Sequence, residues 1–342
     1  KLVVDVIEFC SKNMPLYNPV SISGYHIREA GSTAAQELAF TLNNGFTYID
    51  ECLKRGLKID DFAHRLSFFF NSHIDFFEEI GKYRAARRMW ANKLKNQYKA
   101  RNENSLKLKF HTQTAGCSLT AQQPENNIVR TAYEAMAAVL GGTNSLHTNS
   151  LDETLALPSE KAVKIALRTQ QVLAYETGVA SVADPLGGSW YIEDITNRIE
   201  KEANKYFEII KKLGGTINAI EEGYFQKEIA DSASIYQESI DTKDRIIVGI
   251  NDFIEKDEKL DIEILKISKK AQKIQEKKIE ILKKNRNAKN LNIKMKKLRN
   301  ACENNLNLVP YLVLVAEEGA TIGEIVEVMK NVYGEWEESF GI

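Results

Sequence analysis

Short β-prone runs alternate with longer segments of helical periodicity through about the first 190 residues of the chain. The helical periodicity predicts helices at residues 1–12, 33–55, 76–95, 127–140 and 159–175. The β-prone runs predict strands at residues 20–23, 66–70, 106–112, 144–147 and 179–183. Repeated strand–helix units imply parallel strands joined by helical crossovers, so the predicted fold class is α/β.

About five strands of this kind are visible, whereas a closed (β/α)8 barrel needs eight. We therefore interpret residues 1–192 as the C-terminal part of a TIM-type (β/α)8 barrel. The chain begins without an initiator methionine and opens on a helical pattern, so we expect the remaining strands to lie upstream of Lys1. Residues 193–342 are predicted to form a mainly helical C-terminal region. Within it we expect helices over 193–240 that break at Gly214, a short strand at 245–250 and two packed helices over 306–333.

Polar residues occupy strand positions that Val, Ile and Leu fill in an ordinary barrel interior. Alternate residues of a strand share a face, so His111 and Gln113 point the same way, as do His147 and Asn149. If these side chains face inward, the barrel axis is hydrated and can admit a long, thin, polar ligand. The alternative is that they lie only at the strand ends, above an apolar plug. The pattern alone favours neither arrangement.

Three segments each place a histidine at the C-terminal end of a predicted strand, where the active sites of such barrels lie. They are residues 24–31, 110–116 and 145–150. Three such ends on one chain predict a single shared pocket.

Composition and charge narrow the classes of function. The formal net charge of -1 gives no reason to expect a nucleic-acid or membrane partner. The four cysteines are far apart and form no CxxC pair, which fits a reducing cytoplasmic setting and disfavours structural zinc. No apolar run reaches the ~20 residues that span a bilayer. We interpret the lysine-rich segment 256–299 as a solvated helical linker rather than a nucleic-acid contact, because acidic residues are interspersed and aromatics are absent.

The residues themselves suggest a pocket for a polar ligand with phosphate groups. His26 follows a predicted strand and is the best hydrogen-bond donor or acid, with Glu29 able to orient it. Arg65 and Ser67 share a strand face and suit a phosphate or carbonyl oxygen. The alternative for Arg65 is a salt bridge to an aspartate of the preceding loop. Cys117 is interpreted as a small buried thiol, and the dispersed histidines predict no metal site.

Several ordered stretches resemble the large, catalytic subunit of the adenosylcobalamin-dependent acyl-CoA mutases, of the methylmalonyl-CoA mutase type. The resemblance covers nearly the whole chain and is most specific at residues 21–26, 65–69, 111–114, 126–131, 145–149 and 183–189. It implies a hollow barrel whose axis takes the pantetheine of coenzyme A, with cobalamin over the C-terminal face. The implied reaction is the radical isomerisation of (R)-methylmalonyl-CoA to succinyl-CoA. The alternatives are an isobutyryl-CoA or 2-hydroxyisobutyryl-CoA mutase large subunit, or a non-catalytic subunit of a heterodimeric mutase.

The resemblance also implies roles for individual residues. His26 would hydrogen-bond the thioester carbonyl, and Tyr25 would lie beside the substrate and the adenosyl group. Arg65 and Ser67 would bind coenzyme A. The residues implied to face the adenosylcobalamin cofactor are Glu29, Gln113, Cys117 and Glu153.

Two departures from the family pattern affect the expected partners. The DxHxxG loop of the cobalamin-binding module is absent, so we expect cobalamin to arrive on a separate small subunit; the alternative is that the sequence is truncated before this module. A G-protein chaperone is a further expected partner. The substrate-reading residues of the family lie upstream of Lys1. Arg65 favours methylmalonyl-CoA as the substrate. Leu16 stands where close relatives can carry a lysine that contacts coenzyme A, so we expect that contact to be missing here.

Overall fold

The computed structural model describes residues 1–255, 265 and 268–337. These residues form two compact units. One is built from residues 1–19 and 268–337, and the other from residues 20–255 and 265. The division of the chain into a partial barrel up to residue 192 and a helical region after it stays a prediction.

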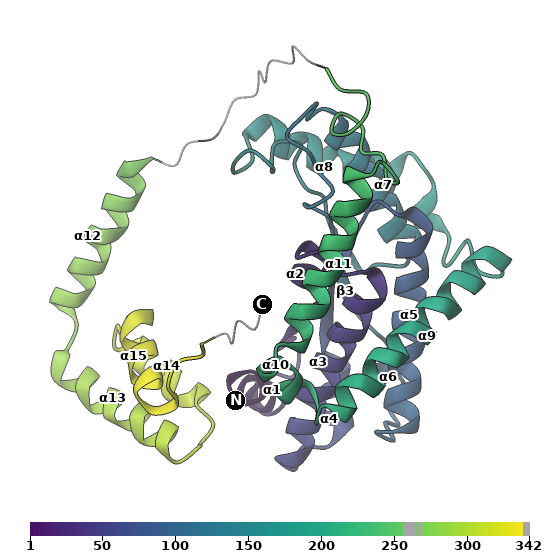
Figure 1. The fold of residues 1–342 in the computed structure, drawn as a ribbon. Coiled ribbons are helices and arrows are strands. Elements are labelled where there is room, and N and C mark those ends of the chain that lie inside the picture. The colour runs from purple at the N-terminus through teal and green to yellow at the C-terminus, as the bar shows by residue number, and fades with distance from the viewer. Residues whose placement is uncertain (256–264, 266–267, 338–342) are drawn as a thin grey trace. The chain divides into compact units, whose positions relative to one another are not determined.

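The larger unit contains a parallel sheet, which confirms the α/β class (Figure 1). Its four strands are β1 (Ser21–Ser23), β2 (Ser67–Ser72), β3 (Phe110–Thr114) and β4 (Ser145–His147). They lie side by side in chain order, and each pairs with the next in parallel. All strand carboxyl ends therefore lie at one edge of the sheet. Closure into a barrel stays a prediction.

Helices connect the strands where periodicity predicted them. The first connection contains α2 (Tyr25–Glu29), α3 (Ala34–Lys54), α4 (Ile59–Phe62) and a 3-10 turn, η1 (Ala63–Arg65). The next contains α5 (Phe76–Asn96) and α6 (Glu103–Leu106). Then come α7 (Asn126–Leu140) between β3 and β4, and α8 (Glu160–Tyr175) after β4.

The core lies between the sheet and the helices. Phe68 of β2 is buried and meets Trp90 of α5 edge to face, with ring centroids 4.9 Å apart. Trp90 also stacks on Phe46 of α3 at 5.7 Å. Gly45 of α3 lies so close to β2 that a Cβ there would be 3.2 Å from the Phe68 ring. A capping box at Thr33 begins α3 and fixes where this helix enters the core.

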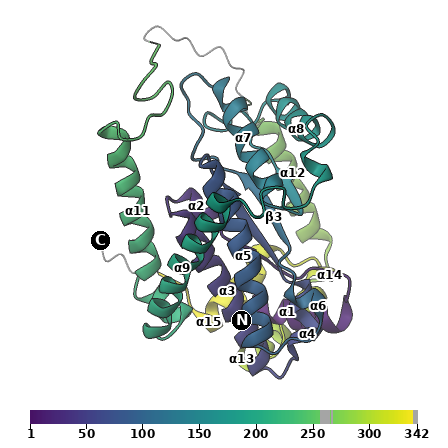
Figure 2. The same cartoon turned by 90° about the vertical axis from the view of Figure 1, so that its right-hand side faces the viewer.

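Three further helices complete this unit. They are α9 (Trp190–Lys212), α10 (Thr216–Glu221) and α11 (Tyr224–Asp241). Helix α9 packs across α5 and α3 as an outer layer (Figure 2). Helix α11 reaches α3 through a hydrogen bond from Gln36 Nε2 to Glu228 Oε2 of 3.2 Å.

Two predicted strands are wrong. The run near residues 179–183 forms a 3-10 turn, η2 (Val179–Ser181), directly after Gly178 in the left-handed region at φ 74°. Residues 245–250 form turns with one isolated bridge between Val248 and Asp252, around Gly249 at φ 84°. In both segments a left-handed glycine turns the backbone away from an extended path.

The smaller unit is helical. It contains α1 (Leu2–Asn13), α12 (Lys269–Asn285), α13 (Ala288–Glu303), α14 (Val309–Glu317) and α15 (Ile322–Tyr333). Its core is formed by the buried side chains of Leu298, Ala301, Cys302, Leu308, Val315 and Val328.

The lysine-rich segment falls partly in this unit. Helix α12 buries none of its residues, which agrees with a solvated helix. Helix α13 buries Leu291 and Leu298, and Leu298 is part of the core of this unit, so the interpretation as a solvated linker is wrong for residues 288–299. Residues 256–264 and 266–267 of that segment lie outside the described residues. Within the part of the chain that the structure describes, no helix combines the length and apolarity needed to cross a bilayer.

Candidate functional site

The two faces of the sheet differ in chemistry. Buried apolar side chains, including Phe68 and Phe70, point from one face into the helical layer. The opposite face is half-buried or exposed and mostly polar: Ser21, Ser23, Ser67, Phe69, His111, Gln113, Ser145 and His147. Polar residues follow this face from the first strand positions, where Ser21 pairs with Ser67, to the last, where Gln113 pairs with His147. They are therefore not confined to the strand ends.

Tyr25 and Gln113 meet at the carboxyl edge of this polar face. Gln113 Nε2 donates hydrogen bonds to Tyr25 Oη and to Asn149 Oδ1, both at 2.9 Å. The Tyr25 ring stacks on Phe69, with centroids 5.0 Å apart and planes at 21°. Burial, and then the charge of Glu29, raises the pKa of Tyr25, so the phenol is a protonated donor at neutral pH. Asn149 completes this cluster. It was not among the predicted site residues, although its position just after a strand of polar residues could have indicated it.

Glu29 lies at the centre of the same edge. Its carboxylate accepts hydrogen bonds from Asn71 Nδ2 at 2.6 Å, from Gly116 N at 2.9 Å and from Cys117 N at 2.9 Å. The prediction that Glu29 orients His26 is wrong. The reason is that the loop after β3 presents two backbone N–H groups, and the carboxylate satisfies both.

His26 is exposed at the start of α2, and its Nδ1 lies 3.3 Å from Ser23 Oγ. Partial burial lowers the pKa of His26, so the ring is neutral at pH 7 and one nitrogen can donate a hydrogen bond. His111 lies 2.7 Å from Ser145 Oγ through Nδ1. Burial and the neighbouring His147 lower the pKa of His111. These histidines give the polar face neutral groups that can donate or accept.

Arg65 and Ser67 lie at the opposite edge of the sheet. Arg65 ends η1 just before β2, and Ser67 Oγ donates to the Val20 carbonyl at 3.0 Å. From Ser67 to Asn71 along β2 the chain rises roughly 13 Å at about 3.3 Å per residue. The structure thus separates Ser67 from the Tyr25 cluster by the length of a strand on the polar face. Arg65 lies in η1, before the strand, so the prediction that Arg65 and Ser67 share a strand face is wrong.

Cys117 and Glu153 lie near the cluster. The expectation of a buried Cys117 is wrong, because the residue is exposed in the loop after β3. Neighbouring atoms still desolvate its sulfur, and with the Glu29 charge they raise the pKa of the thiol to about 12. Burial raises the pKa of Glu153, whose N–H donates to Ser150 O at 3.1 Å. Among the described residues, no group of three or more His, Cys, Asp or Glu side chains is placed to hold a metal ion.

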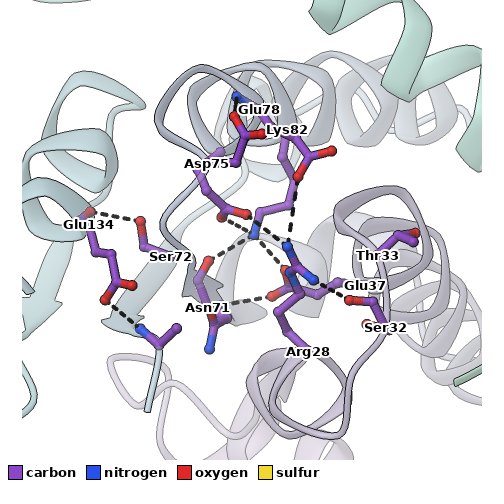
Figure 3. A network of polar contacts seen from close by, with 12 residues as sticks. Arg28, Ser32, Thr33, Glu37, Asn71, Ser72, Asp75, Glu78, Lys82 and Glu134 are labelled. Atoms are coloured by element: carbon purple, nitrogen blue, oxygen red, sulfur yellow. Dashed lines mark hydrogen bonds and ion pairs between the residues drawn. The ribbon is translucent and has the colours of Figure 1, made fainter. Parts of the chain in front are cut away.

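A buried ionic cluster lies directly behind this edge (Figure 3). The Lys82 side chain is fully buried and pairs with Glu37 at 2.5 Å and with Glu79. Arg28 of α2 lies 3.8 Å from the other oxygen of Glu79. Burial raises the pKa of Glu37 to about 7, although the Lys82 charge opposes the rise. Sequence reasoning missed this cluster.

Comparisons with known proteins identify the family of this chain. Residues 1–335 match the family model of methylmalonyl-CoA mutase. The chain belongs to the methylmalonyl-CoA mutase family. The resemblance to the acyl-CoA mutases expected from the sequence is thereby confirmed.

Relatives within the methylmalonyl-CoA mutase family extend beyond this chain. It is 44% identical to the 2-hydroxyisobutanoyl-CoA mutase large subunit of Aquincola tertiaricarbonis, over 99% of this chain and 60% of the relative. It is 43% identical to methylmalonyl-CoA mutase of Rhizobium meliloti, over 98% of this chain and 47% of the relative. It is 42% identical to the human mitochondrial methylmalonyl-CoA mutase, over 98% of this chain and 45% of the relative. The chain therefore spans about half the length of the curated relatives it matches.

The carboxyl edge suits a ligand rich in hydroxyl groups, as expected for the adenosyl cofactor of this family. Gly116 keeps the loop close to these groups: a Cβ would lie 3.0 Å from Glu29 Oε2, 3.3 Å from Asn149 Nδ2 and 3.6 Å from Tyr25 Oη. Asn149 Nδ2 is buried at this edge without a hydrogen-bond partner among the described residues, so it can donate to a ribose hydroxyl, and the neighbouring phenol and carboxylate add a donor and acceptors. The residues present fit such a group.

Proposed function

We propose that this chain contributes the acyl-CoA-binding part of an adenosylcobalamin-dependent carbon-skeleton mutase. The enzyme would be an isomerase that converts (R)-methylmalonyl-CoA to succinyl-CoA. One observation supports this above the others: the Tyr25–Gln113–Asn149–Glu29 cluster lies at the carboxyl edge of a polar sheet face. We further propose that residues 1–192 belong to a (β/α)8 barrel and that this polar face lines its axis. Polar strand residues do not form the packed apolar interior of an ordinary barrel, but they suit an interior that holds a ligand.

Residues at the two edges of that face would bind different parts of the substrate. Arg65 and Ser67 at the amino edge would bind coenzyme A, and the thioester would reach the other edge. There the neutral His26 would donate a hydrogen bond to the thioester carbonyl oxygen and polarise it. Tyr25, fixed by Phe69 stacking and by Gln113, would exclude water from the reacting carbons.

The same edge would face the cofactor. Gln113, Glu29, Glu153 and the Cys117 loop would bind the hydroxyl-bearing adenosyl group. Adenosylcobalamin, when bound, supplies the radical chemistry, whereas the protein orients the groups and excludes water.

The proposed partners follow from the same comparison. A relative named as a large subunit supports a separate cobalamin-binding small subunit, and a G-protein chaperone is a further proposed partner. The four free cysteines support a reducing, cytoplasmic setting.

A second substrate deserves a parallel test, because the relative at 44% identity is named for 2-hydroxyisobutanoyl-CoA. The natural full-length polypeptide should be assembled with adenosylcobalamin and its candidate small subunit. Turnover of methylmalonyl-CoA, isobutyryl-CoA and 2-hydroxyisobutyryl-CoA would then be measured side by side. The preferred acyl-CoA would identify the substrate class.

The role of His26 is tested in the same assay. His26→Ala should lower kcat/KM by roughly 10²–10⁴-fold, because the carbonyl oxygen loses its donor. His26→Gln keeps an N–H donor and should retain more activity. Absence of turnover with every acyl-CoA, although the assembled complex binds cobalamin, would instead indicate a non-catalytic subunit.

A further inference from the structure

The end of β2 is fixed by buried groups on its backbone. Asn71 N donates to Glu37 Oε1 at 2.7 Å. The Asn71 carbonyl accepts from Lys82 Nζ at 2.8 Å and from Tyr83 Oη at 2.5 Å. All of these residues are buried, so water does not compete for the bonds. The backbone of Asn71 therefore has little freedom.

The Asn71 side chain points from that fixed backbone to the candidate site. Its Nδ2 donates to Glu29 Oε1 at 2.6 Å, the shortest of the three hydrogen bonds that Glu29 accepts. Glu29 in turn accepts the N–H groups of Gly116 and Cys117. A continuous path of polar contacts thus runs from Lys82 through Asn71 and Glu29 to the loop after β3.

The same buried cluster also reaches α2 directly. Arg28 precedes Glu29 in this helix, and its guanidinium lies 3.7 Å from Glu78 and 3.8 Å from Glu79. Arg28 also donates to the Ser32 carbonyl just after the helix (Figure 3). Helix α2 carries Tyr25 and His26, so the cluster ties the helix that presents them to the end of β2.

We propose that Asn71 is a positioning residue for Glu29, and that the Lys82–Glu37 pair fixes Asn71 in the required place. This inference rests on the proposed function, in which Glu29 and Tyr25 face the ligand. Neither Asn71 nor Lys82 touches the ligand; both act through Glu29. A misplacement of about 1 Å at reacting groups can lower a rate about 10²-fold.

The first test compares two variants, each of which loses one buried side chain that donates a hydrogen bond to a carboxylate. Asn71→Ala removes the donor to Glu29. Ser105→Ala removes a donor to Asp60, a hydrogen bond of 2.8 Å in the connection before β3. In the assembled holoenzyme, Asn71→Ala should lower kcat by roughly 10–100-fold with less than about a threefold change in KM, because the coenzyme A contacts lie at the other edge. Ser105→Ala should keep kcat within about twofold of wild type.

A double-mutant cycle separates positioning from general damage. If Asn71 acts through Glu29, then Asn71→Ala added to Glu29→Gln should lower kcat by less than about twofold further. Multiplicative losses in the double variant would overturn the proposal, because independent structural damage gives that result.

A second readout needs no catalysis. The Glu29 charge is one cause of the raised pKa of the Cys117 thiol, so the pH profile of Cys117 alkylation by iodoacetamide reports where that carboxylate lies. Glu29→Gln should move the profile to lower pH, with roughly threefold faster alkylation below the pKa for each unit it falls, because the thiolate fraction rises about tenfold while each thiolate becomes less nucleophilic. Asn71→Ala should also shift the profile, because the Glu29 carboxylate loses one of its three donors, and Ser105→Ala should leave it unchanged.

The two readouts have distinct failures. An Asn71→Ala alkylation profile identical to wild type would overturn the positioning role, whatever the holoenzyme does. Wild-type holoenzyme without turnover, together with shifted profiles in Glu29→Gln and Asn71→Ala, would contradict the proposed function while supporting the positioning of Glu29.

Discussion

Replacement of Lys82 by methionine tests the electrostatics of the buried cluster. The Lys82 side chain is 0% exposed, as are the side chains of Glu37 and Glu79 that it pairs with. Methionine fills a similar volume but removes the cation that pairs with two buried carboxylates, of which Glu79 keeps the Arg28 guanidinium at 3.8 Å. Breaking a buried pair in this way costs about 3–5 kcal/mol. Since domains are stable by about 5–15 kcal/mol, the variant should fold but unfold much more readily.

The pH dependence of this loss has a defined sign. Burial raises the pKa of Glu37 in the folded state from 4.5 to about 7. A carboxyl with a raised folded pKa binds its proton more tightly when folded. The contribution of Glu37 to folding stability is therefore fully present below about pH 4.5 and is lost as the pH rises through 7. Without Lys82 the folded pKa of Glu37 rises further, so Lys82→Met should lose less stability at about pH 5 than at about pH 8.

Urea unfolding at these two pH values measures the effect. Trp90 is 1% exposed and lies in the same unit, whereas Trp190 and Trp336 are 92% and 61% exposed, so a change in buried tryptophan fluorescence reports this core. The control is the double variant Lys82→Met with Glu37→Gln, which removes a cation and a carboxylate together. It should recover at least about half of the loss at pH 8. An equal loss at both pH values, or a larger loss at the lower one, would refute the reasoning.

The remaining stability predictions concern one glycine and one ion pair. Gly116→Ala places a Cβ 3.0 Å from Glu29 Oε2 and should lower the unfolding free energy by about 1–3 kcal/mol in urea titrations; Gly323→Ala, whose Cβ meets nothing within 4 Å inside α15, should instead raise it by about 0.5–1 kcal/mol. Hydrogen bonds from Arg286 lower the pKa of Glu324 to about 2. The stability that this ion pair contributes is therefore present above about pH 4.5 and is lost as the pH falls toward 2. Arg286→Gln should therefore lower the Tm at pH 7 by an amount worth at most about 1 kcal/mol and leave it unchanged near pH 2, and an equal fall at both would contradict the assignment.

Periodicity predicted the helices well because their apolar faces pack on the sheet. Helix α3 buries most of one side, and the predicted range 33–55 agrees with Ala34–Lys54. The strands were found where β-prone residues precede a crossover helix, as at Ser67–Ser72. The failures near 179–183 and 245–250 occurred where, among the described residues, a β-prone run has no neighbouring strand to pair with. Local composition does not reveal pairing.

The site was predicted in part for a similar reason. The sequence predicts that Tyr25 and Gln113 lie close together, because both lie at the carboxyl ends of parallel strands, which meet at one edge of the sheet. The choice of partner for Glu29 depends on the loop after β3, about 90 residues later in the chain. Lys82 follows Glu79 by three residues in a charged helix, which is the pattern of an ordinary surface pair. Only the packing of α5 against the sheet buries it.

That burial requires an explanation beyond stability. A buried ion pair is desolvated, and well-packed apolar residues of similar volume are often as stabilising or more so. The aromatic face of this sheet shows that the chain forms such packing around Phe68 and Trp90. At the carboxyl end of β2, however, the chain places Lys82 and Glu37 on the two backbone groups of Asn71. Apolar contacts are non-directional and fix a strand end less sharply than hydrogen bonds with defined donors and acceptors. We therefore infer that the cluster is retained for the geometry that it gives to Asn71 and Glu29, and that its net stabilisation is secondary.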